Sequence, residues 1–472
     1  MTPSYAMNVH ARSAFATRKS SRSMRNNNLP AIFGCRSRTM MQSNFFSSAD
    51  DGTLSASPFE KKEDMNIGIV GGGLAGLSLT YHLLLKAKSL HNINNIQITI
   101  LDQAKTPGTM GASSVAGGLL HPFTPRGKLV HFGLEGLEVT NQLLHAALRH
   151  EPKCILRDCM YRAALSEKHV HQLRQTVEQF PELAQWLSAR ELKDACGAVY
   201  NVDALGGIRM ANGCKVVHVP TYLSGLWQAC RELACASSEM NVHWRQTVAG
   251  INGKNFEGRE FDTVVLAAGS GIVQDDMLDN FDCNNADILP VTLVRGQSVE
   301  LAMKMPHNNA CSAQPQAVLC GKYVAPLDVD IDDNNKEGEV RVLIGATHEY
   351  KEEALTPDAV VDDLKGRSYD LAPSLWDGGT VERITSGWRV QSERGMLGRV
   401  PIVGRVVENN DTNRNNTACE RSCTWLFTGL GSRGLIHHGI YGSILADAIL
   451  SNDDDDENVM LEKYPHMDWW KR

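Results

Sequence analysis

The sequence predicts an α/β fold built on a parallel sheet, and three observations predict it. Residues 66–102 read as a buried β-branched run, a helical pattern and a second β-branched run, which is the order of a β-α-β unit: NIGIVGGGLAGLSLTYHLLLKAKSLHNINNIQITILD. Residues 261–271, FDTVVLAAGSG, form another apolar run that ends in small residues. The 472 residues, 42% hydrophobic and 21% charged, match a globular chain of about two to four domain-sized units.

The first β-α-β unit carries a G-x-G-x-x-G spacing at Gly71, Gly73 and Gly76. The first glycine permits a tight turn, the second lets a pyrophosphate approach the backbone, and the third lets helix and strand pack closely. The acid at the end of the second strand, Asp102, is placed to accept hydrogen bonds from ribose hydroxyls, although it follows Gly76 by 26 positions rather than the usual spacing of about 20. We therefore expect an adenine dinucleotide to be held by these residues together with Leu74, Ala75 and Gln103. The alternative is a purely structural glycine turn, and the motif alone does not separate FAD from NAD.

The first 49 residues, called here the N-terminal basic segment, differ from all that follows. They hold seven Arg or Lys, many Ser and Asn, and no acid before Asp50. This composition is typical of an organellar transit peptide, and we expect residues 1–64 to target a mitochondrion or, as second choice, a plastid. A disordered arm is the alternative. Without the segment, 47 − 7 = 40 basic residues face 54 acidic ones, so the remaining body carries about −14 and does not favour polyanionic partners.

Composition also limits other classes of function. The sequence has no apolar run near the roughly 18 residues that span a bilayer, so we expect no integral membrane segment. The twelve cysteines lack paired C-x-x-C spacing, which favours reduced, mostly buried thiols and an intracellular compartment over a metal site.

A second cluster of small residues, GTMGASSVAGG, occupies residues 108–118. Small side chains and hydroxyls let a segment approach a flat ring or a phosphate, so Ser113 and Ser114 are candidate cofactor ligands; a flexible loop is the alternative. Residues 134–195 are mostly helical in pattern and predict a cap domain.

Further strands and helices follow in an α/β order. Residues 216–220 and 221–234 predict a strand and a helix, and residues 242–248 another strand, which ends at the candidate cofactor residue Val248. The strand within 261–271 ends in Ala268 and Gly269, which fits a position beside the first strand, where bulk would block a cofactor.

Five segments in this order resemble the D-amino acid oxidase and glycine oxidase superfamily of FAD-dependent oxidoreductases. They are GGGLAG, GASS-x-AGG, VVLAAG, LPVTLVRGQ at residues 289–297 and TGLGSRGL at residues 428–435. The resemblance implies FAD as cofactor and a Rossmann-type FAD-binding domain with an inserted α+β substrate domain on a mainly antiparallel sheet. The FAD-binding domain would comprise residues 65–125, 215–288 and 386–452. The substrate domain would comprise residues 126–214 and 289–385, and residues 453–472 would form a tail.

The resemblance also implies site residues. The last motif would lead into a helix over about residues 434–450 whose N-terminus stabilises negative charge on the reduced flavin. Arg389 resembles the family's arginine that binds a substrate carboxylate, and Arg394 or Arg399 could take this role instead. The alternative for each arginine is a surface salt bridge without a role in binding. Tyr323 would present its hydroxyl to the substrate, unless it is a half-buried strand tyrosine only. The cofactor-binding residues of the last motif would be Gly429, Gly431, Ser432, Arg433, Gly434 and Leu435.

The implied chemistry is hydride transfer from the carbon next to an amine to the flavin. We expect a small amine or amino acid of the glycine or N-substituted glycine type as substrate and molecular oxygen as acceptor. The alternative is a tRNA wobble-uridine modifying oxidase, because GLGSRGL is most similar to the FAD domain of the tRNA-modifying enzyme MnmC. Here, however, His437, His438 and Gly439 stand where a Ser-Ala-Pro-like run would be expected. A third possibility is a flavin-binding protein without turnover.

Overall fold

The structure is a computed structural model, and it describes most of the chain from residue 63 onward. The N-terminal basic segment, Val248 and the acidic loop at residues 329–338 lie outside the described residues. The described ranges are 63–90, 93–197, 200–247, 261–274, 277, 289–304, 315–327, 339–406, 423–451 and 456–471.

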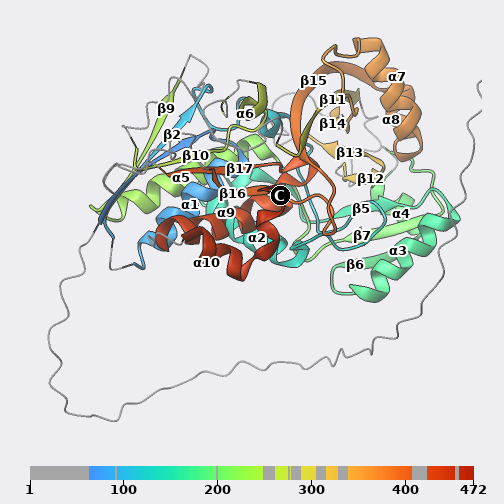
Figure 1. The fold of residues 1–472 in the computed structure, drawn as a ribbon. Coiled ribbons are helices and arrows are strands. Elements are labelled where there is room, and N and C mark those ends of the chain that lie inside the picture. The colour runs from blue at the N-terminus through green and yellow to red at the C-terminus, as the bar shows by residue number, and fades with distance from the viewer. Residues whose placement is uncertain are drawn as a thin grey trace, which may run out of the picture. The chain divides into compact units, whose positions relative to one another are not determined.

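A six-stranded sheet forms the first layer, in the order β16-β17-β10-β1-β2-β9 (Figure 1). All neighbouring pairs are parallel except β16 and β17, which are antiparallel. The central strand β1 carries fully buried Ile67 and Ile69, as expected for a strand covered on both faces. The strands are β1 (Glu63–Val70), β2 (Ile93–Asp102), β9 (Met240–Gln246), β10 (Thr263–Leu266), β16 (Ile402–Val406) and β17 (Cys423–Thr428).

Helices cover the sheet on the side that lies below it in Figure 1. In α1 (Leu74–Ala87), 11 of 14 residues are buried, because the helix is packed between α9 (Gly434–Ser451) and α5 (Val219–Cys235). A helix that is apolar on nearly all sides belongs in a core. The helix α2 (Gly133–Leu148) completes this layer by packing on α9 and α5.

The second sheet has eight strands in the order β15-β11-β14-β13-β12-β5-β7-β6, and all its pairs are antiparallel except β12 with β5. The helices α7 and α8 pack on β11, while α3 and α4 pack near β6 and β7. The strands are β5 (Met160–Ala163), β6 (Ala184–Ser188), β7 (Gly206–Met210), β11 (Val291–Lys304), β12 (Val318–Cys320), β13 (Lys322–Pro326), β14 (Glu339–Gly345) and β15 (Thr380–Ser392). The helices are α3 (Glu167–Gln179), α4 (Ala189–Cys196), α7 (Pro357–Ser368) and α8 (Pro373–Gly378).

A third, smaller sheet has three strands in the order β3-β8-β4. Its strands are β3 (Leu119–Leu120), β4 (Ile155–Arg157) and β8 (Lys215–Val217). The remaining helices are η1 (Ala112–Val115), η2 (Pro152–Cys154), α6 (Gly271–Gln274), η4 (Tyr369–Leu371), η6 (Gly431–Arg433), α10 (Asp456–Lys463) and η7 (Pro465–Lys471).

The predicted fold class is confirmed: a parallel, Rossmann-type sheet accompanies a separate, mainly antiparallel sheet. Two details of the predicted organisation are wrong. The boundary at residue 386 cuts through β15, whose whole length pairs with β11. The helix α2 belongs to the helical layer of the first sheet rather than to a cap. The predicted tail packs on the first sheet, since Trp470 Nε1 donates to the carbonyl oxygen of Val403 (3.2 Å) and Met467 is buried.

Two other expectations concern the whole chain. The eight cysteines in the described ranges form no disulfide, and half of them are buried, in line with reduced thiols. None of the described helices combines the length and the apolar character that crossing a bilayer requires.

Candidate active site between the two sheets

A cavity of about 700 Å³ lies between the two large sheets. The carboxyl ends of β1, β2, β10 and β17 line one part of it, and residues of β11, β13, β14 and β15 line the other. The carboxyl edge of a parallel sheet is the usual place for a ligand in folds of this class. The cavity is therefore the candidate active site.

The glycine turn after β1 shows a separate requirement at each position. Gly71 has φ +103°, and a Cβ there would lie 2.5 Å from the carbonyl oxygen of Ala267. A Cβ on Gly76 would lie 1.9 Å from the carbonyl oxygen of Gly71, which is the close helix-to-strand packing that the sequence predicts. At Gly73, by contrast, only Ser113 Oγ lies near, at 3.3 Å, so the backbone is open toward the cavity. This openness is what an approaching phosphate requires.

The N-terminus of α1 opens into the same space. Gly73 is its N-cap and supplies no side-chain acceptor, so the free N–H groups of the first turn are available to a ligand. Among the described residues, the Leu74 N–H has one side-chain acceptor, Ser113 Oγ, at 3.5 Å. The turn thus presents backbone donors and a positive dipole end to an anion.

Asp102 is held at the end of β2 by backbone donors. Its Oδ2 accepts from the Gly72 N–H (2.6 Å) and its Oδ1 from the Ala104 N–H (2.7 Å). Because each carboxylate oxygen has two lone pairs, the carboxylate keeps acceptor capacity on the side that lines the cavity. These contacts orient the acid for ribose hydroxyls. A dinucleotide such as FAD fits the glycine turn, the helix N-terminus and this acid.

Most of the predicted site residues line the cavity, and three of the described ones do not. Gly76 and Gly429 act in packing and turning the chain, and Ser114 Oγ donates to the carbonyl oxygen of Gly111 (2.8 Å). The predicted residues that line the cavity are Gly71, Gly73, Leu74, Ala75, Asp102, Gln103, Ser113, Ala268, Gly269, Tyr323, Arg389, Gly431, Ser432, Arg433, Gly434 and Leu435.

The guanidinium of Arg389 enters the cavity from β15. Its Nη2 donates to the carbonyl oxygen of Thr347 (2.8 Å), and within the described ranges the other N–H donors have no acceptor. A Cβ on Gly296 would lie 2.6 Å from that nitrogen, so the glycine makes room for the arginine. Burial lowers the pKa of Arg389 from its usual value, against smaller opposing effects from Tyr323 and other groups, but a guanidinium stays charged. Arg394 and Arg399, the alternatives to Arg389, do not line the cavity.

The side chain of Tyr323 lies near Arg389 and is enclosed by glycines. Its hydroxyl is 3.5 Å from Ser298 Oγ, and Cβ atoms on Gly117 or Gly345 would come within 2.6 Å and 2.4 Å of the tyrosine. Burial raises the pKa of Tyr323 above its usual value, so the hydroxyl is neutral at physiological pH and can donate a hydrogen bond.

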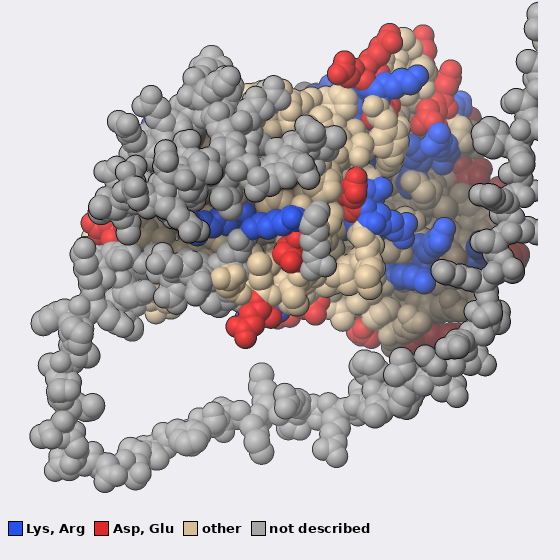
Figure 2. All heavy atoms as spheres, in the orientation of Figure 1, with Lys and Arg blue, Asp and Glu red and all other residues tan. Residues whose placement is uncertain are grey.

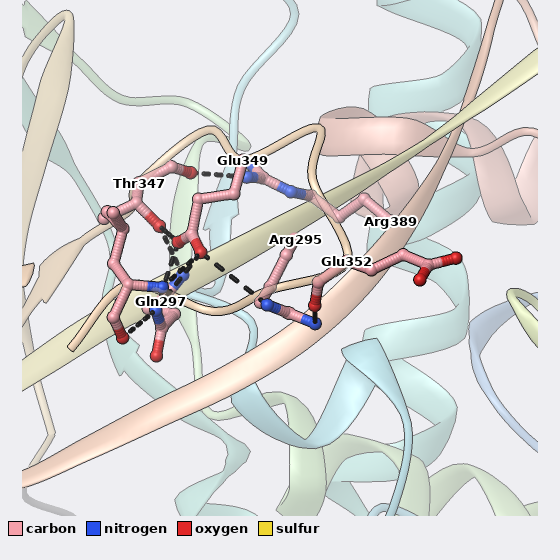
Figure 3. Close-up of polar contacts among 7 residues, drawn as sticks. Arg295, Gln297, Thr347, Glu349, Glu352 and Arg389 are labelled. Carbon is pink, nitrogen blue, oxygen red and sulfur yellow. Dashed lines mark hydrogen bonds and ion pairs between the residues drawn. The ribbon is translucent and has the colours of Figure 1, made fainter. Parts of the chain in front are cut away.

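A buried carboxylate supports the segment that holds Arg389 (Figure 3). Glu349 is 8% exposed and accepts from Thr347 Oγ1 and from Gln297 Nε2 at 3.2 and 3.3 Å. The backbone N–H of Leu355 donates to the same carboxylate at 3.1 Å. These bonds fix residues 347–355, and so they fix the Thr347 carbonyl that Arg389 contacts.

Arg295 joins this network from the opposite side. Its Nη1 lies 3.9 Å from Glu349 Oε2, and its guanidinium stacks 4.3 Å from the ring centre of Trp388. Since Trp388 precedes Arg389 on β15, the network braces both residues before the substrate arrives.

Sequence reasoning missed several polar residues of the cavity. His121, Arg162, Lys322 and His348 all line it. A signal was present for Arg162, because a charged residue interrupts the apolar strand MYRA, and buried charges are retained when they have a partner or a role. Lys322 Nζ is bonded to the Ala346 carbonyl oxygen and lies 3.4 Å from Asp363 Oδ2, so its charge is already balanced.

The charge of the lining is strongly one-sided. Among the described residues that line the cavity, the one acid is Asp102, against Arg162, Lys322, Arg389 and Arg433. Burial is the main cause that lowers the pKa of Arg433, and Arg394 adds to it. The cavity therefore attracts anions and disfavours a second positive charge.

The comparisons with known proteins agree with this geometry. The family described as "DAO: FAD dependent oxidoreductase" matches residues 66–448. No curated protein sequence matches the chain.

Solved structures with the same fold include three oxidases. Glycine oxidase from Geobacillus kaustophilus is 18% identical with a TM-score of 0.57, over 83% of this chain and 95% of that chain. Iminodiacetate oxidase from Chelativorans sp. BNC1 is 18% identical with a TM-score of 0.58, over 84% and 98%. L-α-glycerophosphate oxidase from Mycoplasma pneumoniae, with FAD bound, is 15% identical with a TM-score of 0.53, over 81% and 94%. At these identities the similarity shows the fold alone.

Proposed function

The chain belongs to the DAO family of FAD-dependent oxidoreductases, and we propose that it oxidises the C–N bond of a small amine or amino acid of the glycine or N-substituted glycine type. Its cofactor is FAD, for which the glycine turn, the α1 N-terminus and Asp102 form the dinucleotide end of the cavity. Bound FAD supplies the acceptor for the hydride that leaves the carbon next to the amine. We propose molecular oxygen as the final acceptor.

The observation that carries the proposal is the guanidinium of Arg389 in the cavity. It is half-buried, it is held by the Thr347 carbonyl oxygen, and its remaining N–H donors are available to a planar anion. A carboxylate takes two parallel hydrogen bonds from such a fork, which fixes both position and orientation. An α-amino acid or N-alkylglycine bound this way would have its α-carbon one bond and its amine two bonds from a fixed carboxyl group.

The charge of the lining bears on the protonation state of the amine. Removing hydride from the α-carbon requires the amine lone pair, so the substrate must react as the free base. A positive charge on the amine is disfavoured near Arg389 and Arg433, which lowers the pKa of the bound amine. The neutral hydroxyl of Tyr323, 3.5 Å from Ser298 Oγ, can donate to the substrate carboxylate beside Arg389.

Anaerobic reduction of the purified protein tests the proposal. We expect glycine or N-methylglycine to bleach the flavin absorbance without oxygen, and admission of oxygen to restore it with release of hydrogen peroxide. Failure of every amine to bleach a fully loaded flavin would instead favour a flavin-binding protein without turnover.

A tRNA wobble-uridine side chain is the second candidate substrate, and a local surface feature favours it. On the face drawn in Figure 2, Lys and Arg side chains gather on the side where the eight-stranded sheet lies. Against it stands the net charge of about −14 without the N-terminal basic segment. Binding that relies on phosphate contacts weakens steeply with salt. We expect amine oxidation with little salt dependence, and at most weak, salt-sensitive tRNA binding. Tight tRNA binding at physiological salt, with conversion of a carboxymethylaminomethyl-uridine and no response to free amino acids, would reverse this order.

A further inference from the structure

Arg162 is a buried cation whose hydrogen bonds are incomplete. It lies on β5, is 4% exposed, and lines the cavity. Its Nη1 donates to the Thr124 carbonyl oxygen, but its buried Nε has no acceptor among the residues that the structure describes. No carboxylate of the described residues lies within ion-pair distance of it. Burial lowers the pKa of Arg162 to about 10, so it is charged at neutral pH. A buried charge left unpaired is costly, and buried charges in proteins are normally paired.

The neighbour of Arg162, His121, cannot serve as the missing acceptor. His121 Nδ1 accepts the backbone N–H of Phe123 (3.2 Å). Burial, reinforced by Arg162 and Arg433, lowers the pKa of His121 well below its usual value, so the ring is neutral and carries one proton. We assign that proton to Nε2, because Nδ1 accepts the Phe123 N–H. The Nε2–H group and Arg162 Nη2 therefore face each other as two donors, 3.4 Å apart. Two donors at this distance need an acceptor shared between them.

The two arginines lie on well-separated strands of the eight-stranded sheet. Arg389 is on β15 and Arg162 is on β5, and the order β15-β11-β14-β13-β12-β5 places four strands between them, although both side chains line one cavity. One carboxylate on Arg389 would leave the group around Arg162 without a counter-ion.

We propose that His121 and Arg162 form a second anion site, called here the Arg162 subsite, which binds a second acidic group of the substrate. This inference rests on the proposed function and narrows it: the substrate is an amine that carries two acidic groups, one held by Arg389 and one by the Arg162 subsite. The second group is a carboxylate or a phosphoryl group, since both present the planar or triangular oxygen edge that an arginine fork binds. Either group would accept from Arg162 Nε, Arg162 Nη2 and His121 Nε2–H together.

Inert acids of matched length test the subsite in the full-length holoenzyme. Succinate, glutarate and adipate are titrated against butyrate, valerate and hexanoate at pH 7.5, and Kd is read from the change in flavin absorbance. These probes lack an amine, so the flavin stays oxidised. We expect one dicarboxylate to bind more tightly than its monocarboxylate by about tenfold or more, the effect of one hydrogen-bonded charge pair. 3-Phosphonopropionate shows which acidic group the subsite prefers, because tighter binding than succinate would assign the subsite to a phosphoryl group rather than a carboxylate.

Variants test which side chains cause the tighter binding of the dicarboxylate. Arg162→Met should reduce the ratio of the monocarboxylate Kd to the dicarboxylate Kd to about one, and Arg162→Lys should keep part of it because charge remains without the fork. His121→Asn retains an acceptor for the Phe123 N–H while removing the Nε2 donor, so it should lower the ratio even if Arg162→Met fails to fold. Arg190→Met, at a side chain that is 92% exposed, is the matched control and should leave the ratio unchanged.

The outcomes separate this inference from the function on which it rests. If monocarboxylates perturb the flavin and the second acid adds nothing, the Arg162 subsite is wrong and the proposed function stands. If no carboxylate perturbs a loaded flavin, the proposed function itself fails. A dicarboxylate preference that keeps its full size in both Arg162→Lys and His121→Asn would overturn the assignment. Loss of FAD from these variants would overturn it as well, because it would give the cations to the cofactor.

Discussion

Replacing Arg389 by methionine tests the substrate end of the cavity most directly. Methionine keeps an unbranched side chain but removes the fork that would bind a carboxylate. A buried, hydrogen-bonded charge pair is worth about 2–5 kcal/mol when one partner is removed, which corresponds to roughly 30-fold to 5,000-fold in Kd. Arg389 is half-buried and Lys322 also lines the cavity, so we expect the lower half of that range. The Thr347 carbonyl loses the donor that Arg389 Nη2 supplies.

Propionate binding, read from flavin absorbance, gives the Kd ratio without turnover. The FAD content and the thermal midpoint of Arg389→Met should match those of the natural sequence, because the glycine turn and α1 lie at the other end of the cavity. Arg389→Lys should recover only part of the affinity, since an ammonium group cannot form the planar fork. Arg394→Met is the matched control, because Arg394 is exposed and does not line the cavity.

The reasoning would be refuted by an unchanged propionate Kd in Arg389→Met with FAD fully bound. A loss in Arg394→Met in place of Arg389→Met would move the carboxylate site to the loop after β15. Loss of FAD in Arg389→Met would show that the arginine supports the cofactor rather than the substrate.

Four further predictions address the cofactor, the supporting network, stability and targeting. Gly71→Ala should lose FAD, because its Cβ would lie 2.5 Å from a carbonyl oxygen at a φ of +103°; a full flavin-to-protein ratio on denaturation would contradict this. Glu349→Gln should raise KM for an acidic substrate more than it lowers kcat, because an amide NH₂ would face the Leu355 N–H and loosen the segment that holds Arg389. An unchanged KM would show that the Glu349 network does not contribute to substrate binding. Acid should lower the thermal midpoint, because burial lowers the pKa of His82, His437 and His438 to about 3 or 4. Below pH ~6.5 the unfolded chain binds more protons than the folded chain, and each histidine then costs up to about 1.4 kcal/mol of stability per pH unit until its folded pKa is reached. A midpoint that rises between pH 6.5 and 4 would be incompatible with neutral histidines at these positions. A fluorescent reporter fused behind residues 1–64 should enter an organelle, which we propose to be the mitochondrion, and uniform cytosolic fluorescence would favour a disordered arm.

The sequence predicted the dinucleotide end of the cavity because the residues that form this end are close to one another in the sequence. Gly71, Gly73 and Gly76 lie within six positions, and the close approach of Gly76 to the Gly71 carbonyl oxygen acts within that one turn. Asp102 follows from the end of the adjacent strand. Local spacing therefore carried enough information to place the turn, the helix N-terminus and the acid.

The substrate end depended on tertiary structure. Arg389 is separated from the Thr347 carbonyl by 42 positions, and the choice of Arg389 over Arg394 and Arg399 follows from the register of β15 against β11, which the sequence does not state. The boundary at residue 386 was wrong for the same reason, since strand pairing decides which sheet a segment joins.

The Arg162 subsite shows this limit most clearly. His121 and Arg162 are 41 positions apart and come from different elements, and neither belongs to a recognisable spacing. Their shared need for an acceptor arises only when folding buries both donors and directs them to the same space. Sequence alone determined what is set by neighbouring residues along the chain, while the tertiary structure decided which distant charges share one cavity, because burial and pairing are properties of the folded chain.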